Sequence, residues 1–177
     1  MAKVKMSKKS TKIDMTAMCD VAFLLLSFFV MTSTAKVPEP LPVDTPASTR
    51  ETKLPDTDLV TITVGDGKVF FGMVGQDVRA DALGRIAEKY KLTFTEDETK
   101  RFSLIDGFGV PAGSLKGLIA LKSDERNKDG VQAGVPYDSI DNQLREWILA
   151  ARYATKDLHQ KELKVAIKGD AKEEYPT

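Results

Sequence analysis

The sequence predicts a single-span membrane protein with one N-terminal transmembrane α-helix, a proline-rich linker and an α+β domain that contains a small sheet. Three observations predict this class. Residues 15–35 form an apolar run whose single charged side chain is Asp20. A proline-rich stretch, residues 36–58, follows the run. From Leu59 onward, strand-like and helix-like apolar patterns succeed one another, as they do in α+β domains.

The charge distribution predicts the orientation of the chain. The 177 residues are formally neutral, so the chain lacks the basic excess that is typical of nucleic-acid-binding proteins. The N-terminal tail, residues 1–12, nevertheless carries five lysines. Lysine-rich flanks tend to stay on the cytoplasmic side of a membrane. We therefore expect a cytoplasmic N-terminus and a C-terminal domain on the opposite side.

The apolar run is long enough to cross a bilayer. At 1.5 Å per residue, a helix over residues 15–35 covers roughly 31 Å, about one hydrocarbon core, and we assign residues 13–35 to the span. A cleaved signal peptide is one alternative, because residues 33–35 fit a small-x-small cleavage site. A buried helix of a soluble protein is the other alternative. It would need a polar face, which residues 21–31 lack apart from Ser27.

The polar side chains of the run gather on one helical face. At about 100° per residue, Thr16, Asp20, Ser27 and Thr34 share a stripe roughly 80° wide. A carboxylate inside a bilayer must face protein or water, or be protonated. A carboxyl that moves between wet and dry surroundings takes up and releases a proton, which is the chemistry of a proton-driven machine. The alternative is that Asp20 lies near the headgroups and is merely tolerated.

The residues around Asp20 resemble the signature of the ExbD/TolR family. In that family a lysine-rich tail leads into I-D-M-T-x-M-x-D-V-x-F-x-L-L-x-F-F, which residues 13–29 match almost position by position. The resemblance implies that Asp20 is the protonatable residue of a motor driven by the proton-motive force. Protons would be the coupling ion, with no further cofactor, no metal and no covalent catalytic activity.

The same resemblance implies partners and a location. Two copies of the helix, from a homodimer, would sit inside a ring of an ExbB- or TolQ-like protein in the inner membrane of a Gram-negative cell. The domain would be periplasmic, and a TonB-like transducer would pass the work to outer-membrane uptake. A TolR-like role with a Pal-like partner, including contact with peptidoglycan, stays open. So does a tethered or secreted periplasmic binding module.

The linker, residues 36–58, has too few aliphatic side chains to form a core. Its five prolines favour an extended, polyproline-like chain. We expect a spacer. The alternative is that its most apolar piece docks as a strand onto a partner or onto the chain's own domain. That piece, a candidate partner-binding segment, consists of Pro40, Leu41, Pro42 and Val43.

The domain, residues 59–177, is expected to begin with a β-hairpin. Residues 59–64 alternate in polarity and are rich in β-branched side chains, and residues 68–71 form the returning strand. The Gly-Asp-Gly sequence between them predicts a tight turn. Residues 77–92 then show the apolar spacing of an amphipathic helix.

The middle of the domain, residues 93–137, is longer and more helical than in the simplest members of the family, which indicates an insertion. Thr95 and Glu98 fit a capping box that opens a short helix, and the glycine-rich residues 106–113 break it. A second short helix is expected over residues 114–122, and a polar loop follows it.

The last part of the domain predicts a long helix and a final strand. Asp138 is the expected N-cap of a helix that runs to about residue 155. Its core positions would be Ile140, Leu144, Trp147, Ile148 and Ala151. Residues 162–170 predict the strand. Relatives continue with a further helix and strand, so we expect the domain to be incomplete at its C-terminus.

No residue pattern of an enzyme class stands out. A stretch that includes Arg126 superficially resembles a calcium loop, but the arginine occupies a ligand position. His159, the only histidine, is expected to be a surface or helix-capping residue, and Trp147 a core residue. The single cysteine, Cys19, precludes a disulfide within the chain.

Overall fold

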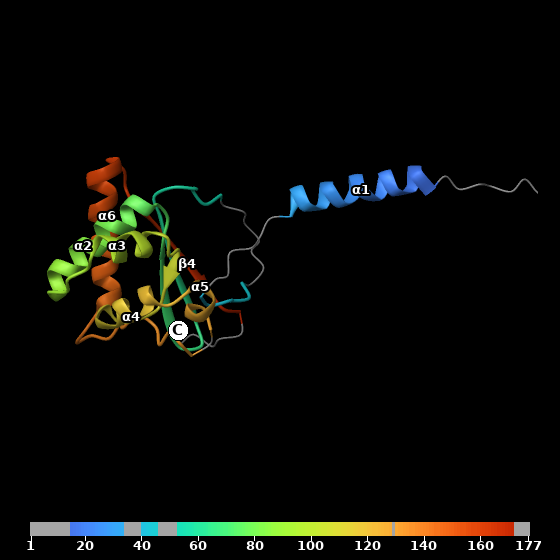
Figure 1. Ribbon diagram of the computed structural model, residues 1–177. Coiled ribbons are helices and arrows are strands. Elements are labelled where there is room, and N and C mark those ends of the chain that lie inside the picture. The colour runs from blue at the N-terminus through green and yellow to red at the C-terminus, as the bar shows by residue number, and fades with distance from the viewer. Residues whose placement is uncertain (1–14, 34–39, 46–52, 129, 172–177) are drawn as a thin grey trace, which may run out of the picture. The chain divides into compact units, whose positions relative to one another are not determined.

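The computed structural model describes residues 15–33, 40–45, 53–128 and 130–171 (Figure 1). The chain divides into two compact units, residues 1–37 and residues 38–177, and each is described by itself.

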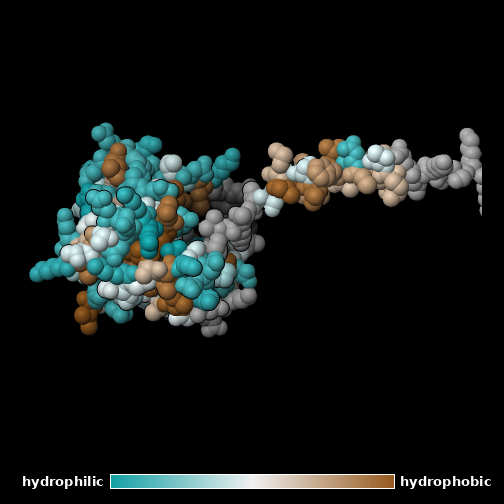
Figure 2. All heavy atoms as spheres, viewed as in Figure 1, coloured by the Kyte–Doolittle hydropathy of each residue, from teal (hydrophilic) through white to brown (hydrophobic). Residues whose placement is uncertain are grey.

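The first unit contains helix α1, Met15–Thr32. Its 18 residues span about 27 Å at 1.5 Å per residue. None of its residues is buried, and its visible surface is largely apolar (Figure 2). By length and composition it can cross a membrane. A core helix of a soluble protein is mostly buried, whereas no residue of α1 is buried. A signal sequence passes the same test of length and composition.

The second unit is built on a four-stranded sheet with the strand order β3-β2-β1-β4 (Figure 1). Strands β1, Leu59–Gly65, and β2, Lys68–Met73, pair antiparallel and form the expected hairpin. Asp66 and Gly67 both have positive φ, as a two-residue hairpin turn of the primed type requires.

The two outer strands flank this hairpin. Strand β4, Lys164–Gly169, pairs parallel to β1, so that Val60 lies opposite Val165. The expected final strand is thereby confirmed. Strand β3, Gly107–Phe108, pairs antiparallel with β2. The glycine-rich stretch was expected to break the preceding helix. It does so, and its two-residue strand pairs with the edge of β2.

Two long helices cover one face of the sheet (Figure 1). They are α2, Gln76–Tyr90, and α6, Gln143–His159. Trp147 of α6 is completely buried and packs against three phenylalanines, with ring centroids 4.8–6.1 Å apart. Those rings belong to Phe71, Phe102 and Phe108. The expectation that Trp147 is a core residue is confirmed.

Short helices fill the segment between α2 and α6. Helix α3, Glu96–Ser103, begins with the expected capping box, in which both hydrogen bonds between Thr95 and Glu98 are present. A 3-10 turn, Ala112–Ser114, leads into α4, Leu115–Ala120, which confirms the second short helix. The loop that follows was expected to lack helix, but it contains α5, Ser123–Arg126.

The start of α6 differs from the expectation. Asp138 does not cap it; the side chain of Asn142 accepts a hydrogen bond from the Arg145 N–H at 2.9 Å. The Gln143 side chain, which is bound to the Ala112 N–H at 2.8 Å, further fixes this first turn. Ile140 therefore lies in the preceding loop and is fully exposed, whereas the other four expected core positions lie within α6.

Candidate functional site

Asp20 lies in the second turn of α1 and is exposed along that helix. Continuous helix from Met15 to Thr32 places Thr16 and Ser27 on the same face as Asp20, because residues four and seven positions apart align along a helix. Asp20 is the only carboxylate in the described part of this unit. Thr34, the fourth member of the expected stripe, lies outside the described residues.

Ser27 contributes its hydroxyl to the helix itself. Its Oγ donates to the Leu24 carbonyl at 2.8 Å, so the proton of this hydroxyl needs no other acceptor in an apolar environment. The hydroxyl oxygen keeps acceptor capacity on the stripe that holds Asp20. This oxygen can accept a hydrogen bond from water.

The candidate partner-binding segment, Pro40 to Val43, lies against its own domain. A Cβ at Gly65 would meet side-chain carbons of Leu41 and Val43 at 3.0 Å. The Asp44 carbonyl accepts a hydrogen bond from the Ala171 N–H at 2.8 Å. Of the two docking alternatives, the structure describes the one in which the segment packs onto its own domain.

A second polar cluster joins three elements of the domain. His159, the last residue of α6, places Nδ1 against an Asp58 carboxylate oxygen and Nε2 at 2.8 Å from Asp77 Oδ2. Asp58 precedes β1, and Asp77 lies in the first turn of α2. Lys161 adds an ion pair to Asp58 at 3.7 Å. His159 was expected at the surface or at the helix cap. It does end the helix, and it also bridges two carboxylates.

The cluster shifts the protonation equilibria of its members. Hydrogen bonds with Asp58 and then Asp77 raise the pKa of His159 above its usual 6.5. The hydrogen bond from His159 lowers the pKa of Asp58 and that of Asp77 below the usual 3.8. The imidazolium and the two carboxylates therefore stabilise one another.

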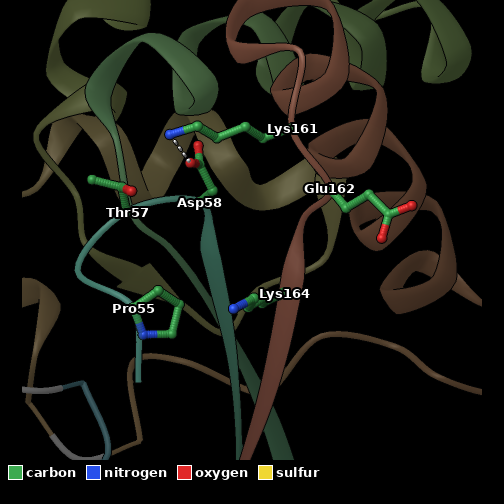
Figure 3. Close-up of a pocket in the computed structure, with 6 residues that line it drawn as sticks. All are labelled: Pro55, Thr57, Asp58, Lys161, Glu162 and Lys164. Carbon is green, nitrogen blue, oxygen red and sulfur yellow. Dashed lines mark ion pairs between the residues drawn. The ribbon is translucent and has the colours of Figure 1, made fainter. Parts of the chain in front are cut away.

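Beside this cluster lies a shallow pocket of about 360 Å³ (Figure 3). Its lining residues are Pro55, Thr57, Asp58, Lys161, Glu162 and Lys164. The Lys161 ammonium points toward Asp58, whereas the Glu162 carboxylate points away from it (Figure 3). Within the described ranges, no group of three or more His, Cys, Asp or Glu side chains is arranged to hold a metal ion.

Comparison with known families decides the affiliation of the chain. The family model described as biopolymer transport protein ExbD/TolR matches residues 6–176. This chain belongs to the ExbD/TolR family. No curated protein and no solved structure matched it in the corresponding searches. The resemblance inferred from the residues around Asp20 is thereby confirmed over essentially the whole chain.

Membership in the ExbD/TolR family implies a subunit of an energy-transducing motor for biopolymer transport, with ExbB/TolQ-like and TonB/TolA-like proteins as partners. Together with α1, it indicates a single-pass protein of the inner membrane. Sequence reasoning did not find the cluster of Asp58, Asp77 and His159. The available signal was a lone histidine at the end of an amphipathic helix, which does not identify its partners.

Proposed function

We propose that this ExbD/TolR-family chain is the ExbD-type subunit of a motor driven by the proton-motive force, and that Asp20 carries the proton. The supporting observation is a lone carboxylate on an otherwise apolar helix, aligned with the hydroxyls of Thr16 and Ser27. A carboxyl in that position is neutral when it faces an apolar surface and ionised when it faces water. Passage between the two environments transfers a proton.

The energy released by each proton transfer determines how many protons one mechanical step requires. One elementary charge that crosses about 100 mV supplies about 2.3 kcal/mol. Several protons are therefore needed for a substantial mechanical step. In the proposed arrangement, two copies of α1 lie inside an ExbB-like ring, with the N-terminus in the cytoplasm and the domain in the periplasm. The linker passes the work to a TonB-like transducer.

The proposed partner of the domain is a protein. The part of the chain that follows the apolar run has a slightly acidic balance, which favours docking of a protein over a glycan such as peptidoglycan. This feature supports the Ton pathway over the TolR-like alternative.

Substitution of Asp20 tests the proposal. Asp20→Asn keeps the shape of the side chain but cannot ionise, so we expect normal co-purification with the ring protein and loss of energy-dependent uptake. Asp20→Glu retains a carboxyl and should keep part of the activity. Cys19→Ala, which alters the neighbouring position off the polar stripe, is the matched control. Full uptake by an assembled Asp20→Asn motor would refute the role of Asp20.

The pathway is tested separately in cells that lack the gene for this chain. Loss of TonB-dependent uptake with an intact outer-membrane barrier supports the ExbD role. A detergent-sensitive envelope with normal uptake would assign the chain to the Tol-Pal pathway.

A further inference from the structure

In the cluster around His159, both ring nitrogens can donate hydrogen bonds only if the ring is protonated. Both ring nitrogens of His159 face carboxylate oxygens, one from Asp58 and one from Asp77. An ionised carboxylate only accepts hydrogen bonds, and a neutral imidazole has one N–H to donate. The imidazolium has two. The observed geometry is therefore that of the protonated ring.

The two carboxylates differ in how far water can replace the histidine as a hydrogen-bond donor. The side chain of Asp58 is 8% exposed, and that of Asp77 is 53% exposed. A buried acceptor that loses its donor incurs a desolvation cost, whereas an exposed one is rehydrated. Asp77 also accepts from the Val78 backbone N–H in the first turn of α2. Loss of the hydrogen bond from His159 therefore costs less free energy at Asp77 than at Asp58.

We propose that His159 is a proton-operated clasp between α2, α6 and the start of β1. The protonated ring holds Asp58 and Asp77 together. The neutral ring keeps its proton on Nδ1, remains bound to Asp58 and releases Asp77, which frees the first turn of α2 from the end of α6.

The charged groups around the ring agree with this order of events. Within the described residues, they are Asp58 ahead of β1, Asp77 on α2 and Lys161 in the connection from α6 to β4. Lys161 pairs with the second oxygen of Asp58, so it does not compete with the ring for the first. Asp58 also has a left-handed backbone conformation, with φ of 58°, and its carbonyl accepts from the Lys164 N–H at 2.9 Å. Its position is thus fixed independently of the histidine.

The clasp lies where residues 53–58, the end of the linker, lead into β1. In a periplasmic domain, the compartment that supplies protons to Asp20 would also set the state of the clasp. That consequence rests on the proposed function, whereas the clasp itself does not.

Nuclear magnetic resonance of the full chain in detergent micelles tests the clasp. The chain has one histidine, so isotope labelling of histidine gives a single imidazole signal without assignment ambiguity. We expect a titration midpoint above the usual 6.5 or so, and a neutral form protonated on Nδ1, where Nε2 is the usual site. A midpoint near the usual value, or a neutral form protonated on Nε2, would overturn the proposal.

Two variants with the same change of charge supply the comparison. Asp77→Asn alters a half-exposed side chain and should fold; it should lower the midpoint and leave the Nδ1 proton in place. Asp66→Asn, in the hairpin turn, tolerates the same backbone conformation and should leave the midpoint unchanged. Equal midpoints in the wild type and Asp77→Asn would contradict the clasp.

Hydrogen exchange distinguishes a histidine that releases α2 on deprotonation from one that titrates without affecting α2. Protection factors at residues 78–80, in the first turn of α2, should fall at alkaline pH in the wild type. They should be low at every pH in Asp77→Ala, which has no side-chain group for the ring to bind. Protection that does not change with pH in the wild type would show that α2 is not released.

Discussion

His159 Nε2 lies 2.8 Å from an oxygen of Asp77, although 82 residues separate the two in the sequence. The other ring nitrogen meets Asp58, which lies 101 residues away. One side chain thus joins the start of β1, the first turn of α2 and the end of α6. These three elements frame one end of the domain, so its stability should depend on the charge of a single ring.

The first prediction concerns the pH dependence of folding. Because the folded domain raises the pKa of His159, the histidine stabilises the folded state fully below about 6.5, and this contribution is lost as the pH rises through the raised value. The pKa values of Asp58 and Asp77 are lowered, so the stabilisation from these carboxylates depends on pH in the opposite direction. It is lost only in acid, as the pH falls through their lowered pKa values. The free energy of unfolding should therefore fall on the alkaline side.

Urea unfolding of the full chain, followed by fluorescence, measures this effect. Trp147 is the only tryptophan and is fully buried, so its emission reports the domain alone. His159→Gln should remove the alkaline decline, because glutamine does not titrate. A decline of the same size in His159→Gln would assign the pH dependence to other groups.

The second prediction concerns the segment that packs on Gly65. A Cβ there would meet Leu41 and Val43 at 3.0 Å, and valine would add further atoms in the same space. Gly65→Val should displace the segment and expose it to proteolysis. The Ala171 amide, which donates to the Asp44 carbonyl, should exchange faster.

The control for this substitution is Gly84→Ala on α2, where an added Cβ has no neighbour within 4 Å. Gly84→Ala should leave both readouts unchanged. Unchanged cleavage and exchange in Gly65→Val would mean that the segment does not depend on this contact.

The third prediction concerns the aromatic core. Trp147 contacts three phenylalanine rings, and its Nε1 is buried without a hydrogen-bond partner among the described residues. Trp147→Ala should cost about 3–5 kcal/mol of stability. Trp147→Phe should cost clearly less than Trp147→Ala, because it keeps most of the ring packing and removes the unpaired N–H. Thermal unfolding monitored by circular dichroism compares the two variants.

The relative stabilities of Trp147→Phe and Trp147→Ala can also contradict this prediction. Equal losses for Trp147→Phe and Trp147→Ala would contradict both reasons, because neither the retained ring packing nor the removed N–H would then give any gain.

Much of the fold followed from local patterns. The hairpin, α2 and the capping box at Thr95 depend on periodicity and on residues three or four positions apart, which a sequence displays directly. The start of α6 did not follow, because Asn142 caps the helix locally while Gln143 fixes the same turn by accepting from the distant Ala112 N–H. Strand β3 is too short for any period and exists because β2 pairs with it.

The sequence by itself determined the membrane helix and the place of Asp20 within it, since the spacing of polar side chains along one helix is a local property. It also carried the family affiliation. Only the tertiary structure decided that β4 lies beside β1, that the linker segment packs on Gly65 and that His159 meets two carboxylates. Such contacts join residues far apart in the chain, and their geometry exists only after the sheet and helices have packed.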